Sequence, residues 1–194
     1  MSRVVGQRAV CGFVLLLAVF VDRASAQEPR YYATLYGSSA GPLRFGKTHT
    51  WANYVKVTPT ATGLIVEPVT ISWLPADGDV NTFRPFRREP GVNLTHAETV
   101  RRVAADGARI ASFGPFEIDV NRYHAAQSQV ARLQSGAVAY LAVDSVGRNP
   151  SVSNCVHAVT GADPVLAGER QPWYRIGIRG TRQIAGQYTT GLRR

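Results

Sequence analysis

Residues 49–74, HTWANYVKVTPTATGLIVEPVTISWL, contain two runs of strand-forming residues on either side of a turn signal. Residues 49–58 alternate between two faces with the period of a half-buried strand. The segment PTATG at 59–63 favours a tight turn, and residues 64–74 again favour a strand, with an interruption near Pro68. We therefore predict an antiparallel hairpin at the centre of the fold.

Strands and helices are predicted on both sides of this hairpin. Further strands are expected at residues 31–36, 137–143 and 173–179, with a short strand or an extended link at 109–113. Helices are expected at 95–106, at 119–134 and from residue 154 or 155 onward. Thr95 with Glu98 has the spacing of a capping box, and Asp119 is in place to cap the second helix. The predicted fold class is α+β, an antiparallel sheet with two or three helices packed on it.

Two segments are expected to lie outside regular structure. Residues 75–91 contain three prolines and the basic cluster Arg84, Arg87 and Arg88, which indicates a long loop with either a functional or a plain surface role. The glycine-bearing basic segment 186–194 is expected to fray.

Residues 1–26 have the three parts of a secretory signal peptide. Arginines stand at the start, an apolar stretch covers residues 10–21, and the small-residue sequence Ala-Ser-Ala occupies 24–26. The alternative is a retained anchor, although a membrane span needs about 20 apolar residues. We expect an exported, periplasmic or extracellular protein whose mature chain, 27–194, forms a single globular α+β domain.

The chain is basic, with a formal net charge of +9. Removing the signal, with its three arginines and one aspartate, lowers this charge to +7. All the basic residues except Lys47 and Lys56 are arginines, whose planar forks suit carboxylate or phosphate oxygens. The charge suggests a cell-envelope polymer or lipid as a partner, or simply a solvated basic surface. Nucleic acid is not predicted, because the arginines are scattered and no nucleic-acid motif is present.

Cys155 is the one cysteine that follows the signal segment. It stands in the run Ser-Asn-Cys-Val-His at 153–157, where a loop is predicted to turn into a short helix. A helix N-terminus lowers the pKa of a thiol and favours the nucleophilic thiolate. We therefore expect Cys155 to be a partly exposed nucleophile, with a small buried structural cysteine as the alternative.

A thiol nucleophile needs a base, most often histidine, within hydrogen-bond reach. His157 is two residues from Cys155 along a helix and so points away from it, which favours a packing or surface role. His96 and His124 are expected on helix surfaces. His49 begins a strand after a loop, where a rigid scaffold can present a base, and the hairpin brings it near Ser72.

Polar residues on the second strand of the hairpin, Thr70 or Ser72, are candidates to orient the His49 imidazole. A metal site is not predicted, because Cys155 and His157 lack a usable zinc spacing and no second ligand cluster exists. No nucleotide cofactor is predicted either, because no glycine-rich phosphate loop follows a strand.

These motifs resemble the circularly permuted branch of the NlpC-like papain-fold hydrolases, which includes lecithin:retinol acyltransferase. The resemblance rests on a strand that opens with His49 and a later helix that opens Asn154-Cys155-Val156-His157. It implies a papain-like permuted arrangement, Cys155 as nucleophile and His49 as base. Two features depart from the family: the aromatic residue soon after the cysteine is absent, and the third polar residue, often histidine, is replaced by Ser72 or Thr70.

Two functions remain open from the sequence. The first is an exported thiol hydrolase or acyltransferase that acts on cell-wall peptide or a lipid acyl group. In it Cys155 attacks an amide or ester, His49 and Ser72 complete the catalytic set, and backbone N–H groups at the helix that Asn154 opens bind the oxyanion. The second is a non-catalytic exported protein that binds an anionic envelope component through its arginines.

Overall fold

The computed structural model describes residues 28–41, 47–78, 80, 85–144, 149–164, 166 and 176–191. The strands are β1 (Arg30–Ser39), β2 (His49–Thr60), β3 (Gly63–Ile71), β4 (Trp73–Pro75), β5 (Glu89–Asn93), β6 (Arg109–Ile118), β7 (Ala139–Tyr140) and β8 (Val152–Ser153). The helices are α1 (His96–Ala105), α2 (Val120–Gln134), α3 (Cys155–Thr160) and α4 (Gly177–Gly191). The predicted α+β class is confirmed.

The main sheet has the strand order β3-β2-β1-β6 and is antiparallel throughout. A smaller sheet, β4-β5-β7-β8, has one parallel pair, β7 with β8. The predicted hairpin is β2 with β3, which closes at Thr60 opposite Gly63. The expected interruption is wrong: β3 continues through Pro68, because an edge strand tolerates a residue with no N–H to donate.

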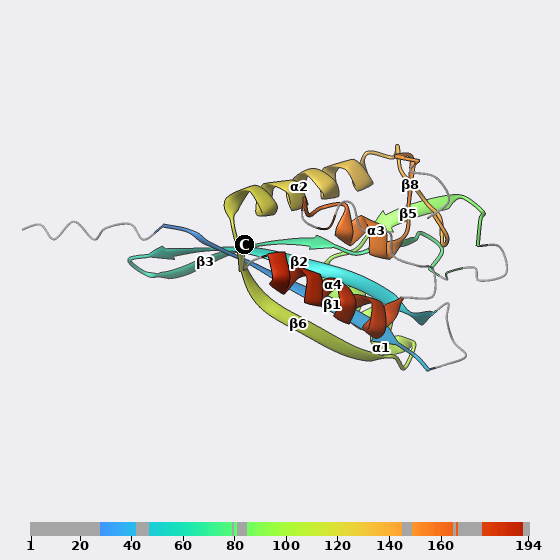
Figure 1. The fold of residues 1–194 in the computed structure, drawn as a ribbon, viewed down its shortest axis with the longest axis horizontal. Coiled ribbons are helices and arrows are strands. Elements are labelled where there is room, and N and C mark those ends of the chain that lie inside the picture. Colours follow the sequence, from blue (N-terminus) through green and yellow to red (C-terminus); the bar gives the residue numbers. More distant parts are fainter. Residues whose placement is uncertain are drawn as a thin grey trace, which may run out of the picture.

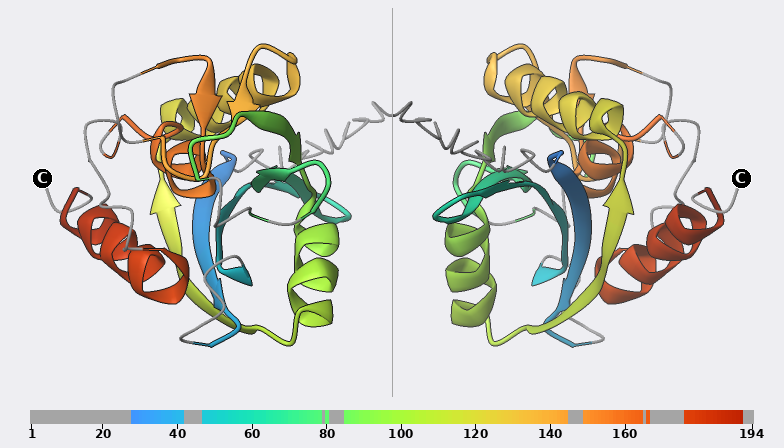
Figure 2. Two further views of the ribbon diagram at one scale, coloured as in Figure 1. Left: turned by 90° about the vertical axis from the view of Figure 1, so that its right-hand side faces the viewer. Right: turned by 90° about the vertical axis from the view of Figure 1, so that its left-hand side faces the viewer.

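Helices cover the main sheet on both sides. α1 and α4 lie on opposite faces, as Figure 2 shows, and α4 packs against β1, β2 and β6. α2 and α3 lie together beside the hairpin, with α2 against β3 and α3 against β2 (Figure 1). The core between these layers includes the fully or nearly fully buried side chains of Leu35, Tyr54, Ile71, Trp73 and Leu133.

α4 corrects two predictions. The strand expected at 173–179 is wrong for residues 177–179, which are helical, and the frayed segment expected from residue 186 is helical as far as Gly191. Residues 173–175 and 192–194 lie outside the described part of the chain. The buried residues of α4 follow helical spacing, but most are small, so the apolar signal is weak: Gly177, Gly180, Thr181, Ile184 and Ala185.

Replacing Gly37 by alanine is expected to lower the free energy of unfolding by about 1–3 kcal/mol, because α4 packs directly on this residue. A Cβ at Gly37 would lie 2.6 Å from Thr181 Oγ1 and 2.8 Å from the Ile178 Cα. Urea unfolding measures the change. Gly186→Ala on the exposed side of α4 is the control, since nothing lies within 4 Å of its added Cβ and alanine favours helix. A Gly37→Ala midpoint equal to that of the native chain would contradict the described contact.

Local signals placed several other elements correctly. Thr95 and Glu98 form the predicted capping box at α1, and Asp119 caps α2. The short strand or extended link predicted at 109–113 is a strand, and it continues to Ile118 as β6. The strand predicted at 137–143 is reduced to Ala139–Tyr140, because β7 has only short partners in β5 and β8.

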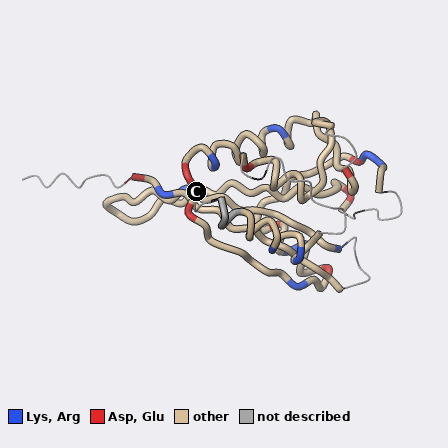
Figure 3. Tube along the Cα trace, in the orientation of Figure 1, with Lys and Arg blue, Asp and Glu red and all other residues tan. Residues whose placement is uncertain are grey.

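The long loop predicted at 75–91 is bounded by β4, which ends at Pro75, and β5, which starts at Glu89. Arg87 and Arg88 are exposed, whereas Arg84 lies outside the described residues. Figure 3 shows lysines and arginines on several separate elements. The predicted signal peptide, 1–26, also lies outside the described part of the chain. Within the described ranges, every helix is too short or too polar to cross a lipid bilayer.

Candidate functional site

Cys155 is the first residue of α3, and its position depends on the residue before it. Asn154 is the N-cap, and its side-chain oxygen accepts the N–H of His157 at 2.8 Å. The predicted helix start is therefore confirmed. The thiol lies near β2, close enough to the backbone N–H of Thr50 for this group to lower the thiol pKa. The pairing of β2 with β3 begins at Ala52, so Thr50 lies in the part of β2 that is not paired with β3.

The Cys155 thiol is buried, with 7 % of the residue exposed. Burial raises its pKa to about 11, and the nearby Asp144 carboxylate raises it further, against the lowering effect of backbone hydrogen bonds from Thr50, Val156 and Cys155 itself. The expected exposed thiol with a lowered pKa is therefore wrong. α3 has six residues, so its N-terminus offers a weak dipole that does not compensate for the desolvation of a thiolate.

His49 is buried at the start of β2, and its Nε2 lies 2.9 Å from Ser72 Oγ. The hairpin therefore brings His49 to Ser72, as the strand pattern indicates. The other candidate partner, Thr70, donates its hydroxyl to Asn53 instead. Burial, together with the charge of Arg102, lowers the His49 pKa to about 3, so the imidazole is neutral at pH 7.

Ser72 belongs to a chain of hydroxyl groups that continues into α1. Thr99 Oγ1 lies 2.7 Å from Ser72 Oγ and 2.8 Å from the carbonyl oxygen of Thr95, which can only accept. Thr99 carries one hydroxyl proton, which either Ser72 Oγ or the Thr95 carbonyl oxygen accepts; when the carbonyl accepts it, Ser72 can donate to Thr99 and accept from His49 Nε2–H. This direction leaves His49 Nδ1 as an unprotonated acceptor, which is less costly than a buried N–H without a partner.

His49 Nδ1 has no hydrogen-bond partner among the described residues, although it is fully buried. Nε2 bonds Ser72, so no hydrogen bond joins the imidazole to the thiol within the described contacts. The described link between the two residues is indirect: the thiol lies near the backbone of Thr50, the residue that follows His49. The His49 ring also stacks on Trp51, with ring centroids 5.5 Å apart.

The other three histidines lie in different surroundings. His124 is exposed on α2 and bonds Gln127, which confirms its expected surface position. His96 begins α1 and accepts a hydrogen bond from Trp51 Nε1 at 3.2 Å, so it belongs to a half-buried aromatic cluster instead of a free helix surface. His157 is half-buried and its Nδ1 bonds the Asp144 carboxylate.

Asp144 is a residue of the site that sequence reasoning missed. Its carboxylate accepts the backbone N–H and the side-chain N–H of Asn154, at 2.8 and 2.7 Å, as well as bonding His157. It precedes Asn154 by ten residues and has no motif of its own, so only the folded chain brings it to α3.

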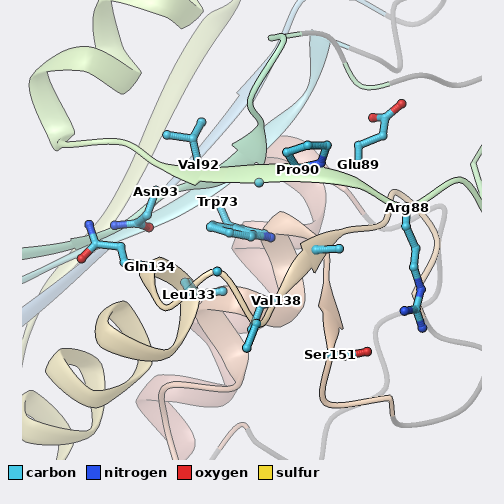
Figure 4. A pocket seen from close by; sticks show the side chains of 14 residues that line it. Trp73, Arg88, Glu89, Pro90, Val92, Asn93, Leu133, Gln134, Val138 and Ser151 are labelled. Atoms are coloured by element: carbon cyan, nitrogen blue, oxygen red, sulfur yellow. The ribbon is translucent and has the colours of Figure 1, made fainter.

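A cavity of about 640 Å³ is lined by Trp73 and by residues of β5, β7 and the end of α2. As Figure 4 shows, Trp73, Leu133 and Val138 lie on one side of β5 and form an apolar wall, and Arg88 stands at one end. His49 and Cys155 do not line it. Trp73 Nε1 donates to the carbonyl of Ser153 at 3.1 Å, so this wall supports the segment that leads into Cys155.

Comparisons of the chain with protein-family models, with curated proteins and with solved structures gave no match. Among the described residues, no group of three or more His, Cys, Asp or Glu side chains has an arrangement that could hold a metal ion. The chemistry of the site is therefore inferred from the geometry of the thiol, the imidazole and the hydroxyl groups.

His49 is expected to make the fold sensitive to acid. Its pKa falls from 6.5 in the unfolded chain to about 3 in the folded one. Between these values the unfolded state binds a proton that the folded state does not, so the free energy of unfolding decreases as the pH falls from 6.5 towards 3. The loss reaches a few kcal/mol at about 1.4 kcal/mol per pH unit.

Urea unfolding between pH 7 and 4 measures this contribution. His49→Gln should flatten the dependence on pH, whereas His124→Gln, which removes an exposed imidazole, serves as the matched control. Equal slopes for the native chain and His49→Gln would show that His49 is not the buried neutral group described above.

Proposed function

We propose that the protein is a thiol-dependent hydrolase or acyltransferase in which Cys155 is the nucleophile and His49 the base. The observation that carries this proposal is the buried Nδ1 of His49, which has no hydrogen-bond partner among the described residues, on a ring whose Nε2 is bonded to Ser72. A buried polar atom without a partner is rare, and it is expected where a reaction step supplies the partner. In this proposal the missing partner is the Cys155 thiol, which lies near the backbone of Thr50, the residue after His49.

The proposed reaction begins with a neutral pair. The Cys155 pKa of about 11 and the His49 pKa of about 3 both favour the uncharged thiol and imidazole. His49 Nδ1 takes the thiol proton as the sulfur bonds to the carbonyl carbon of an amide or ester. The same proton then passes to the leaving amine or alcohol, and a thioester remains on Cys155. Water completes a hydrolysis, whereas a second nucleophile completes an acyl transfer.

Ser72 has the role of orienting the imidazole in this scheme. The scheme requires the 2.9 Å hydrogen bond between the two residues to run from Nε2–H to Ser72 Oγ, which is the tautomer in which Nδ1 is the acceptor. The backbone N–H groups of Cys155 and Val156 lie close enough to the sulfur to lower its pKa, and in this scheme they also donate to the developing oxyanion. Asn154 supports them as the cap of α3.

The order of a strand histidine before an Asn-Cys helix start supports a papain-like permuted arrangement, with Ser72 in the place of the third polar residue. For an exported protein, the substrate is proposed to be an amide of cell-wall peptide or a lipid acyl ester. Because the thiol is buried, acylation requires the substrate to displace residues that cover it.

A second function is favoured by that same burial. A neutral thiol of pKa about 11 has the properties of a structural cysteine. Phe86, Arg87 and Arg88 are exposed beside one another in the segment before β5. In this alternative the protein has no catalytic role and binds an anionic envelope component through its arginines.

Acylation by a simple activated ester separates the two functions. The folded chain is incubated with p-nitrophenyl acetate, and intact-mass and peptide analysis then locate the acetyl group. The hydrolase proposal expects one acetyl group on Cys155, none on Cys155→Ala, and a much lower yield on Ser72→Ala. Equal labelling of the native chain and Cys155→Ala would favour the binding protein.

A further inference from the structure

Asp144 makes three hydrogen bonds to the residues beside the candidate nucleophile. Its side chain is 4 % exposed. One carboxylate oxygen accepts the backbone N–H of Asn154, and the other accepts the Asn154 amide and bonds His157 Nδ1. These three bonds hold the residues on both sides of Cys155.

The segment that Asp144 holds cannot position itself. An isolated helix shorter than about 12 residues is unstable in water, and α3 has six. The Asn154 side chain turns back to the N–H of His157, so Asp144, Asn154 and His157 form one closed network around the first turn. Any movement of this turn moves the sulfur relative to Thr50 and His49.

The charge of Asp144 acts against thiol activation. A carboxylate near the sulfur disfavours the thiolate, and Asp144 raises the pKa of Cys155 as well as that of Tyr140. The negative charge of Asp144 therefore does not help Cys155 to ionise. Its hydrogen bonds to Asn154 and His157 indicate that it fixes the position of the first turn of α3 instead.

We propose that Asp144 is the positioning residue of the candidate site, which acts through Asn154 and His157 to fix the first turn of α3 and with it Cys155. This inference rests on the proposed function for its catalytic meaning. The network itself does not depend on that function, so it can be measured separately.

The test compares Asp144→Asn with the native chain in two readouts. The first is the rate of iodoacetamide alkylation of Cys155 against pH, which reports thiol ionisation. The second is the rate of p-nitrophenolate release from p-nitrophenyl acetate in single turnover. Loss of the carboxylate should lower the pH at which alkylation reaches half its maximum, because the neighbouring negative charge is gone.

The two roles of Asp144 predict acylation changes of opposite sign. If Asp144 positions the turn, ester acylation at neutral pH falls about tenfold or more although the thiol ionises more easily. If Asp144 acts only through its charge, acylation rises with the thiolate fraction, and that result would overturn the proposal. Glu89→Gln is the control, since Glu89 also raises the pKa of Tyr140 but is not among the groups that affect the thiol.

Two further variants keep the outcomes distinct. Asn154→Ala removes the amide that joins Asp144 to the turn, and it should slow acylation without shifting the alkylation midpoint as Asp144→Asn does. The double variant should be no slower than Asp144→Asn alone, because both act through one network. If Cys155→Ala releases p-nitrophenolate as fast as the native chain, the proposed function fails. If Asp144→Asn releases p-nitrophenolate at the native rate while Cys155→Ala does not, the positioning role is wrong but the proposed function stands.

Discussion

His49→Ala and Cys155→Ala are each expected to reduce single-turnover release of p-nitrophenolate to the rate of the uncatalysed ester. The double variant is expected to be no slower than either single one, because a nucleophile and its base act as a unit. The loss should be roughly a thousandfold or more, as for other catalytic pairs that are broken. Stopped-flow absorbance measures the release.

His124→Ala is the control for this experiment, and His157→Gln is a comparison in which only the position of α3 is disturbed. His124 is exposed on α2, so its variant should retain the native rate. His157 contacts Asp144 and should have an intermediate effect through the position of α3. A native rate in His49→Ala would remove His49 from the mechanism, and a native rate in Cys155→Ala would remove the thiol chemistry altogether.

Breaking the buried ion pair between Arg122 and Asp163 is expected to cost about 3–5 kcal/mol of the free energy of unfolding. The guanidinium of Arg122 on α2 donates to both carboxylate oxygens of Asp163, at 2.9 and 3.0 Å, and both side chains are almost fully buried. Arg122→Met leaves the Asp163 charge buried without this partner. Urea unfolding at pH 7 measures the loss.

Two comparisons isolate the pair. Arg122→Met combined with Asp163→Leu should recover much of the loss, because apolar replacement of a whole buried pair is far less costly than removal of one partner. Glu117→Gln breaks the exposed pair with Arg30 and should leave the urea midpoint near its native value. A single Arg122 variant as stable as the native chain would show that the pair does not hold α2 to the segment after α3.

Features that depend on neighbouring residues were predictable from the sequence. The β2–β3 hairpin follows from alternation and from the turn at Thr60 to Gly63, and the capping of α1 by Thr95 follows from a three-residue spacing. α4 was not predictable in the same way. Its buried stripe is made mostly of glycine, threonine and alanine, whose packing value appears only against Gly37 and the main sheet.

In the candidate site, too, contacts set by local sequence were predictable and those set by the folded chain were not. The register of the hairpin was enough to bring His49 to Ser72, which the structure places 2.9 Å apart. The protonation state of Cys155 was not predictable, because burial by distant segments outweighs the local effect of a helix start. Asp144 was missed for a related reason, since its link to Asn154 exists only in the folded chain.

The tautomer of His49 decides whether His49 can act as the base for Cys155. Long-range ¹H–¹⁵N NMR on a histidine-labelled chain distinguishes the two ring nitrogens at neutral pH. We expect a neutral ring with the proton on Nε2, bonded to Ser72, and an unprotonated Nδ1 whose resonance moves when Cys155 is replaced by alanine. A proton on Nδ1, or an Nδ1 resonance that does not respond to the loss of the thiol, would contradict the pairing of His49 with Cys155.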